Sequence, residues 1–219
     1  MMKDSISSGT GTKEALDKLL SRAPNIIDEG LTFKERLEQP ISYRYIWTFN
    51  KIEEWRIKQG KESKDIFILD VGSWTGMMSY LLNKAGYRVT ALDSNKEYLD
   101  IIKEHSTEVN TMEGDIMNIP EIISSKYDIV IALEVIEHLT PDKEAIQRIY
   151  SVVAENGLLI ATTPIEKNLL CKEHVNFYDF YQIMELFDII TDDYKICRLH
   201  KFDKNRTPNI WGIIVNKGE

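Results

Sequence analysis

The chain has 219 residues, of which 43% are hydrophobic and 28% are charged, and these values fit one globular domain with a full hydrophobic core. Its 27 Lys and Arg against 35 Asp and Glu give a formal net charge of −8, which argues against a broadly basic surface for nucleic-acid backbones. Cys171 and Cys197 are too few for a disulfide framework, and no N-terminal stretch has the apolar core of a signal peptide. Apolar runs such as Ile129 to Leu133 are far shorter than a membrane span. The sequence therefore predicts a soluble cytoplasmic protein.

Residues 1–60 are expected to form a tail and a helical cap, and residues 61–219 the main domain. Residues 1–12 are rich in Ser, Gly and Thr, and helices are expected over 13–21 and from 42 to about 59. The second of these helices carries one apolar stripe, made by Tyr45, Phe49, Ile52 and Trp55, and is closed by Gly60. The stripe favours docking of this helix on a sheet.

From residue 66 onwards, strand and helix patterns alternate. Strands are expected over 66–69, 87–92, 109–112, 127–133 and 157–162, with helices over 77–85, 96–104, 142–153 and 177–187. The last two expected strands, 194–200 and 210–216, have no helix between them. This order predicts the α/β class, with a doubly wound parallel sheet and an antiparallel last strand.

The stretch from Ile66 to Gly76 organises the whole chain. Four apolar residues lead into Asp70, then into a turn with Gly72 and Gly76, and then into a helix. The two glycines allow positive φ and close approach of a ligand, while the unpaired amides at the helix start offer donors. Neither a Gly-Lys-Ser/Thr ending nor a Gly-x-Gly-x-x-Gly fingerprint is present. The loop is therefore predicted to be a nucleotide-type cradle of another kind.

Two further acids follow the next two expected strands. Asp93 comes 17 residues after Gly76, at a position where ribose hydroxyls bind a carboxylate. The alternative is that Asp93, Ser94 or Asn95 caps the following helix. Asp115 follows the third strand and precedes Ile116 and, five positions on, Pro120.

These stretches together resemble the class I S-adenosylmethionine-dependent methyltransferases, whose first motif is Asp-x-Gly-x-Gly-x-Gly. Asp70, Gly72 and Gly76 fit that motif, but Trp74 replaces its middle glycine, which in the family lies against the methionine part of the cofactor. The resemblance covers roughly residues 43–216. It implies a Rossmann-like sheet of seven strands and S-adenosylmethionine as the cofactor.

The resemblance also implies which residues contact the cofactor. Asp115 corresponds to the acid that bonds the adenine amino group, and the amide of Ile116 to the one that meets the ring, with a solvated turn as the alternative for both. Tyr43 and Tyr45 correspond to lid positions, with core packing as the alternative for both. The implied cofactor-binding set is Asp70, Gly72, Ser73, Trp74, Gly76, Asp93, Ser94, Asp115, Ile116, Leu133 and Tyr45.

The fourth strand is the most apolar one and is expected to be central, with Glu134-Val135-Ile136-Glu137-His138 at its carboxyl end. This string resembles that of small-molecule O-methyltransferases, including ubiquinone-biosynthesis and sugar-modifying enzymes. It also resembles the small-RNA 3′-terminal 2′-O-methyltransferases, which hold a divalent metal with Glu-x-x-Glu-His and a later His.

Methyl transfer to oxygen requires an acceptor in line with the sulfonium carbon and removal of its proton. A histidine, with an unperturbed pKa of about 6.5, suits that task. The candidate catalytic residues are therefore His138, His174 and Glu134.

A divalent metal is a further prediction. Glu134, Glu137 and His138 occupy positions i, i+3 and i+4, which lie on one face if the segment is helical. With His174 they form a mixed oxygen and nitrogen set suited to magnesium, manganese, iron or zinc. The alternative is that the acids cap the next helix and His138 acts alone as a base.

The sequence thus predicts methyl transfer to a hydroxyl oxygen of a small polar molecule, such as a sugar derivative or a quinone precursor. The alternatives are a metal-dependent RNA 3′-terminal 2′-O-methyltransferase, an NAD-dependent oxidoreductase, and a non-catalytic protein in which Trp74 blocks the methionine end. The overall acidity favours a small molecule over RNA. A local basic cluster could instead bind phosphate groups and so favours RNA, although a solvated loop also explains it. The cluster consists of Arg198, Lys201, Lys204 and Arg206. No membrane partner is expected, and the oligomeric state is left open.

Overall fold

The computed structural model of the chain describes residues 43–165, 173–199 and 210–218. The expected tail, the helix over 13–21, Cys171 and three members of the basic cluster lie outside these residues. Within the described ranges, no helix has both the length and the apolar character that crossing a membrane requires.

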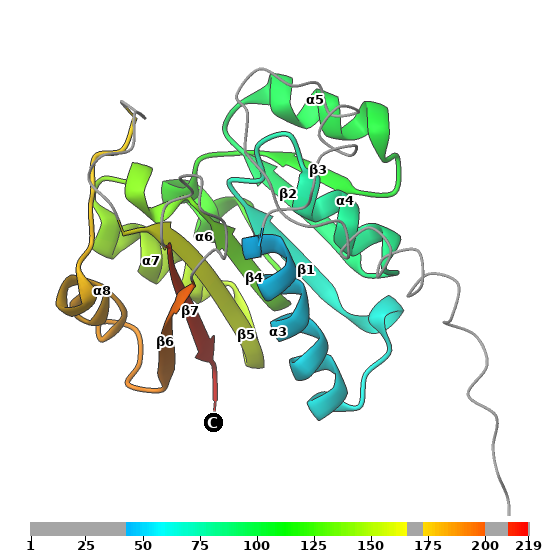
Figure 1. Cartoon of the computed structure of the whole chain (residues 1–219). Helices are drawn as coiled ribbons and strands as arrows, with labels where there is room; N and C mark the ends of the chain where they lie inside the picture. Colours follow the sequence, from blue (N-terminus) through cyan, green and yellow to red (C-terminus); the bar gives the residue numbers. More distant parts are fainter. Residues whose placement is uncertain (1–42, 166–172, 200–209, 219) are drawn as a thin grey trace, which may run out of the picture.

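Seven strands form one sheet in the order β3-β2-β1-β4-β5-β7-β6 (Figure 1). Neighbours among β1 to β5 run parallel, whereas β7 runs antiparallel to both β5 and β6. The predicted doubly wound sheet with an antiparallel strand is therefore confirmed. The strands are β1 (Phe67–Val71), β2 (Arg88–Asp93), β3 (Asn110–Glu113), β4 (Tyr127–Leu133), β5 (Val153–Pro164), β6 (Tyr194–Leu199) and β7 (Ile210–Asn216).

Helices cover both faces of the sheet (Figure 1). One face carries α3 (Tyr43–Gln59), α4 (Met77–Lys84) and α5 (Lys96–His105), and the other carries α6 (Ile119–Ile122), α7 (Asp142–Ser151) and α8 (Phe180–Phe187). Because successive side chains of a strand point to opposite faces, Ile68 packs into one core and Leu69 into the other. Three short 3-10 helices complete the described elements: η1 (Ser63–Asp65), η2 (Ile116–Asn118) and η3 (Ile136–His138).

Helix α3 packs into the same core as the sheet. Its residues Trp47, Ile52 and Trp55 are buried there, and the indole nitrogen of Trp55 donates to the carbonyl of Asn156 at 3.2 Å. A Cβ at Gly212 on β7 would lie 2.8 Å from the Trp47 ring, so this glycine makes room for the helix. The expected docking of the apolar stripe is confirmed.

Among the elements whose boundaries differ from the expectation, one helix and one strand differ most. The helix expected over 177–187 begins only at Phe180, because Asp179 and Gln182 form a capping box at its start. The strand expected over 157–162 is longer at both ends, and its pairing with β4 shifts register between Tyr127 and Ile129.

Candidate active site

Acidic residues gather at the carboxyl edge of the parallel strands. Asp70 lies near the end of β1 and pairs in register with Ala91 of β2, Asp93 ends β2, and Glu134 follows β4. Parallel strands carry their carboxyl ends to one edge, where ligands of open α/β sheets bind. The sheet order therefore brings the predicted residues of these strands to a common edge.

The loop between β1 and α4 needs both of its glycines. Gly72 has φ 64° and Gly76 has φ 77°. A Cβ on Gly72 would lie 2.7 Å from the Val135 side chain, and one on Gly76 would lie 2.4 Å from Ile102. The backbone amide of Ser73 donates to the carbonyl of Leu92 at 3.0 Å, which ties the loop to β2.

Asp93 is held by backbone amides on both of its carboxylate oxygens. Oδ2 accepts from the amide of Trp74 at 2.8 Å and Oδ1 from the amide of Asn95 at 2.9 Å. The cap of α5 is Asn95, whose side chain accepts from the amide of Glu97, so Asp93 does not cap that helix. Each carboxylate oxygen keeps a further lone pair for a hydroxyl donor, and the neighbouring Ser94 is exposed.

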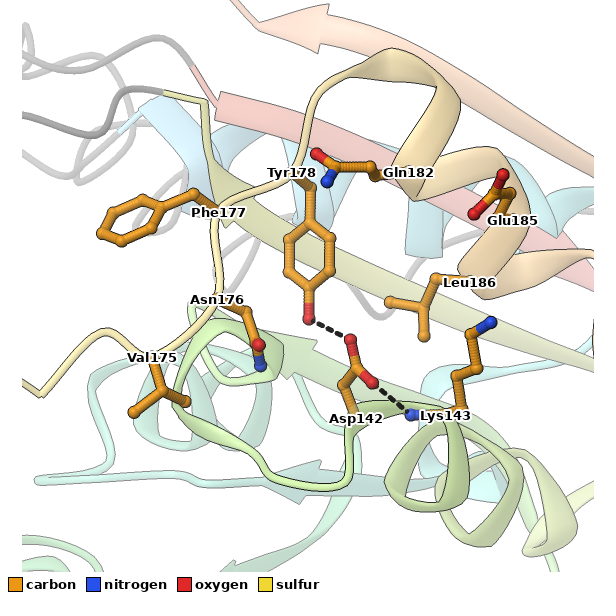
Figure 2. Close-up of a pocket in the computed structure, with 9 residues that line it drawn as sticks. All are labelled: Asp142, Lys143, Val175, Asn176, Phe177, Tyr178, Gln182, Glu185 and Leu186. Atoms are coloured by element: carbon orange, nitrogen blue, oxygen red, sulfur yellow. Dashed lines mark hydrogen bonds between the residues drawn. The ribbon is translucent and has the colours of Figure 1, made fainter.

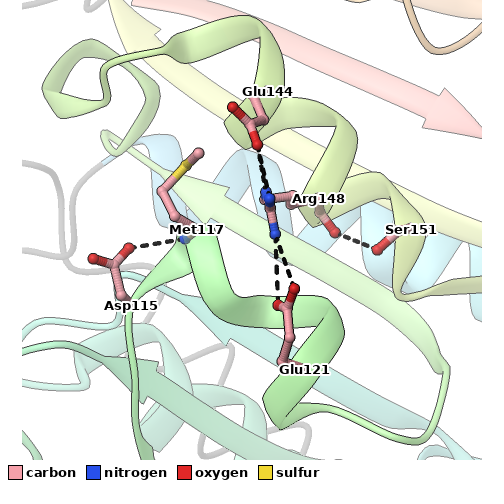
Figure 3. Close-up of polar contacts among 6 residues, drawn as sticks. All are labelled: Asp115, Met117, Glu121, Glu144, Arg148 and Ser151. Atoms are coloured by element: carbon pink, nitrogen blue, oxygen red, sulfur yellow. Dashed lines mark hydrogen bonds and ion pairs between the residues drawn. The ribbon is translucent and has the colours of Figure 1, made fainter.

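Asp115 is exposed and caps η2, because its Oδ1 accepts from the amide of Met117 at 2.8 Å (Figure 3). The segment that follows is fastened to α7 by Arg148. This guanidinium pairs with Glu144 at 2.7 Å and with Glu121 at 3.5 Å. Ile116 is half-buried against the core.

Asp70 lies beneath the loop with only 3% of its surface exposed. Its Oδ2 accepts from the Ser79 hydroxyl at 2.6 Å, which joins β1 to α4. Burial, aided by the charge of Asp93 and opposed by the Ser79 hydrogen bond, raises the pKa of Asp70 to about 7.

The segment after β4 is not one helix. Glu134 has φ 57°, and only Ile136–His138 forms a helical turn. The expected helical face at Glu134, Glu137 and His138 is therefore wrong. The backbone amide of Glu134 instead donates to the carbonyl of Thr162 on β5 at 2.9 Å.

Glu137, His138 and His174 meet in one cluster. Ligand atoms of these three residues all lie within 4.8 Å of one another, and Glu134 is not part of the group. The two imidazole rings are 4.7 Å apart and nearly perpendicular. The structure thus brings His174 to His138 from a separate loop, a contact that the sequence left open.

Each member of the cluster is held by a defined contact. Glu137 is fully buried and accepts a hydrogen bond of 3.0 Å from the Thr163 hydroxyl. Burial, together with the charge of Glu134, raises the pKa of Glu137. His138 Nδ1 lies 3.1 Å from the carbonyl of Glu173. Because a carbonyl only accepts, this contact requires a proton on Nδ1, and in the neutral ring with that tautomer the lone pair is on Nε2. Burial, and then the neighbouring His138, lower the pKa of His174 and favour its neutral form.

The loop that carries His174 is fixed by residues that the sequence did not single out. The backbone amides of Val175 and Asn176 both donate to the carbonyl of Glu137, at 2.9 and 3.0 Å. The Tyr178 hydroxyl donates to Asp142 at 2.9 Å, at the start of α7 (Figure 2). A cavity of about 340 Å³ lies between this loop, α7 and α8. A pattern of isolated polar residues in a loop gives no periodicity from which these contacts follow.

Arg44 on α3 is a second feature that sequence reasoning missed. Its guanidinium lies 4.9 Å from the Tyr45 ring. Burial lowers the pKa of Arg44, but Tyr45 and then the charges of Glu134 and Glu137 raise it above its ordinary value. The same positive charge opposes the effect of burial on the pKa of Glu134. Tyr45 itself packs, half-buried, beside Met77 and Leu81, and Tyr43 is exposed.

Buried polar atoms without a hydrogen-bond partner concentrate at this edge. Of the seven such side-chain atoms in the described part of the chain, only Thr48 Oγ1 lies outside the loop and the acid-histidine region. Buried polar groups are nearly always satisfied in native proteins, so this concentration marks the place of a ligand. The six atoms are Ser73 Oγ, Thr75 Oγ1, Arg44 Nε, Glu134 Oε1, Glu137 Oε1 and His174 Nδ1.

Residues 69–161 match the protein family described as "Methyltransferase domain". Among curated proteins, the chain is 29% identical over 104 residues to a ubiquinone biosynthesis O-methyltransferase of Actinobacillus pleuropneumoniae, covering 44% of each chain. It is 26% identical over 193 residues to the protein of that name from Rickettsia akari, covering 78% of this chain and 74% of the relative. A third such relative, from Pelagibacter ubique, is 27% identical over 128 residues, 52% of its length. The chain thus spans about half the length of the Actinobacillus and Pelagibacter relatives.

Solved structures share the fold of the methyltransferase domain. Magnesium protoporphyrin IX methyltransferase from Synechocystis, solved with bound S-adenosylmethionine, superposes with a TM-score of 0.58 at 15% identity, covering 97% of this chain and 100% of that one. A second solved structure, from Bacillus halodurans, superposes with a TM-score of 0.63 at 11% identity, covering 78% of this chain and 100% of that one. The described residues therefore have the fold of the S-adenosylmethionine-bound Synechocystis methyltransferase.

Proposed function

We propose that this chain transfers the methyl group of S-adenosylmethionine to a hydroxyl oxygen of a small polar acceptor, such as a quinone precursor or a sugar derivative. The observation that carries the proposal is the group of unpaired buried polar atoms on Arg44, Glu134, Glu137 and His174, beside the glycine loop. The curated relatives named ubiquinone biosynthesis O-methyltransferase support oxygen as the acceptor atom.

The residues present fit the cofactor. The loop packs against Val135 and Ile102 only because Gly72 and Gly76 lack side chains. The buried hydroxyls of Ser73 and Thr75 in the same loop have no hydrogen-bond partner and are free to bind a ligand. We assign Asp93 to the ribose hydroxyls, and Asp115 and Ile116 to the adenine, since these residues end or follow the next two strands. Further contacts are assigned to Asp70, Trp74, Ser94, Leu133 and Tyr45. When bound, the cofactor supplies an already activated methyl group.

Two chemistries fit the acid-histidine cluster. In the first, the Nε2 lone pair of His138 takes the acceptor proton, and the Glu173 carbonyl holds the ring in the tautomer that this requires. In the second, Glu137, His138 and His174 would hold a divalent cation, which would lower the pKa of an acceptor hydroxyl. The unpaired Oε1 of Glu137 and Nδ1 of His174 are the atoms that fit a cation.

An aromatic cavity beside the cluster supports a quinone precursor over a sugar. The Phe177 ring is 6.2 Å from His174, and the Phe180 ring is 5.8 Å from Trp211. A cavity of about 280 Å³ is lined by Phe177, Phe180 and Trp211, together with Ile165, Tyr178, Asp179 and Gln182. A flat apolar ring would bury more surface there than a sugar.

Transfer of a labelled methyl group to extracted small metabolites and to total small RNA tests the proposal. We expect labelling of a small hydroxyl compound, lost in His138→Ala and kept in the control His105→Ala, whose histidine ends α5. Strong RNA labelling that is inhibited by salt would favour the RNA alternative. Of the basic cluster that could bind RNA, Arg198 is the member within the described residues. Binding of S-adenosylhomocysteine without transfer to either pool would indicate a non-catalytic protein.

Two further features stay predictions from the sequence. The cytoplasmic location rests on the low cysteine content. The division of the chain at residue 60 rests on the composition of the N-terminal part, of which only α3 and Gly60 are described.

A further inference from the structure

Trp74 adopts a backbone conformation that suits glycine. Its φ is 50°, in the left-handed region that side chains rarely occupy. Among the described residues only two other non-glycine residues share this feature, and one of them is Glu134 at the acid-histidine region. Such positions persist where the surroundings stabilise them, often at ligand sites. We therefore expect the tryptophan at this position to have a function that depends on its ring.

Trp74 contacts the acid assigned to the ribose through its backbone and Tyr98 of α5 through its ring. Its backbone amide donates to Asp93 Oδ2 at 2.8 Å, so residue and carboxylate are directly joined. Its indole meets the Tyr98 ring edge to face at 6.2 Å. Tyr98 stands in the first turn of α5, which begins three residues after Asp93. Both aromatic side chains are half-buried.

The two residues that flank Trp74 point to a ligand independently. The hydroxyls of Ser73 and Thr75 are buried, each residue being only 8% exposed, and neither has a hydrogen-bond partner. The unpaired hydroxyls of the β1–α4 loop, the Trp74–Tyr98 ring pair and the carboxylate of Asp93 thus come together at the carboxyl ends of β1 and β2.

We propose that Trp74 and Tyr98 form an aromatic wall that packs against the nucleoside part of S-adenosylmethionine. The inference rests on the cofactor assignment and is independent of the methyl acceptor. Purine bases and riboses offer apolar faces to aromatic rings, and base stacking on an aromatic ring contributes measurably to affinity. The wall also keeps water from the hydrogen bonds between Asp93 and the ribose, where a drier environment strengthens them. In the resembling family the glycine at this position lies against the methionine part of the cofactor. In this chain the Trp74 ring instead packs against Tyr98 of α5, the helix that follows Asp93, and we assign the ring to the nucleoside part for that reason.

Calorimetric titration with S-adenosylhomocysteine and with adenosine tests the wall. We expect Trp74→Gly to weaken both ligands about tenfold, and Trp74→Phe, which keeps a ring, to bind within about threefold of the wild type. Tyr98→Ala should weaken binding less than Trp74→Gly, while Tyr98→Phe stays at the wild-type value. Quenching of tryptophan fluorescence by the ligand should vanish in Trp74→Phe, although Trp47, Trp55 and Trp211 remain.

The unfolding temperature of each free variant separates a binding role from a structural one. Trp74→Gly loses ring contacts but relieves the left-handed strain, so we expect it to stay folded and to lose affinity alone. Unchanged or tighter binding by Trp74→Gly would overturn the wall, and tighter binding would mean that the ring obstructs the site. If the wild type binds neither ligand, the cofactor assignment itself fails. Tight binding without methyl transfer would count only against the proposed function.

Discussion

The Asn176 side chain donates a hydrogen bond of 2.6 Å to the carbonyl oxygen of Leu139, 37 residues earlier in the chain. The same amide nitrogen lies 3.4 Å from the carbonyl of Ile136, and the Asn176 backbone amide donates to the carbonyl of Glu137. One residue thus holds the loop that carries His174 against the turn that carries His138. It sets the spacing of the two imidazoles and acts as a positioning residue.

Replacing Asn176 by Asp should lower kcat and leave cofactor affinity unchanged. A carboxylate cannot donate to the Leu139 carbonyl and is repelled by it, which removes a hydrogen bond worth about 1 to 3 kcal/mol. We expect at least a tenfold fall in kcat, with the Kd of S-adenosylhomocysteine within a factor of about two. Steady-state kinetics and calorimetry measure the two quantities, with Asn110→Ala on the edge strand β3 as the control. Equal losses in kcat and in affinity would contradict a positioning role.

Much of the site follows from the sequence because strand order places residues. Asp93 and Glu134 each mark the carboxyl end of an apolar strand, and parallel strands bring those ends together. The conformation of Glu134 does not follow, because its left-handed backbone depends on a hydrogen bond to Thr162 of another strand. Arg44 was missed for a similar reason. A single arginine on an amphipathic helix gives no spacing signal, and its role depends on which acids the fold places beside it.

Asp93→Ala should weaken binding of S-adenosylhomocysteine at least tenfold. The variant loses two carboxylate acceptors for the ribose, worth about 1.5 to 3 kcal/mol together. The variant also loses the hydrogen bonds that the backbone amides of Trp74 and Asn95 donate to the Asp93 carboxylate in the wild type. The control is Asp100→Ala, which removes a carboxylate from the outer part of α5 that pairs with Lys96. The ribose assignment would be abandoned if the two variants bound equally well.

Glu137→Gln separates the two chemistries of the acid-histidine cluster. Glutamine keeps the size of the side chain and an acceptor for the Thr163 hydroxyl, but it removes a charged metal ligand. If a divalent cation is bound, Glu137→Gln and exhaustive chelation should each lower turnover at least tenfold, and added cation should restore only the chelated wild type. If His138 acts as a metal-free base, chelation leaves turnover intact and His138→Ala alone abolishes it. Metal content by mass spectrometry, compared with that of His105→Ala, provides the independent measurement.

Asp70→Asn should stabilise the free protein at high pH more than at low pH. Burial raises the pKa of Asp70 from 3.8 to about 7 in the folded protein. Between these two values the folded state holds a proton that the unfolded state has lost, so stability falls as the pH rises through this window and then levels off.

The asparagine variant has no proton to lose at this position, and its carbonyl still accepts from the Ser79 hydroxyl, the contact that Asp70 makes at 2.6 Å. Relative to wild type, we expect a gain in the free energy of unfolding that is small at pH 4 and reaches at most about 4 kcal/mol above pH 7. Denaturant unfolding of both proteins without cofactor, at one-unit pH steps, measures this difference. A difference that does not change with pH would mean that Asp70 is ionised throughout this range and that its burial is compensated by another group.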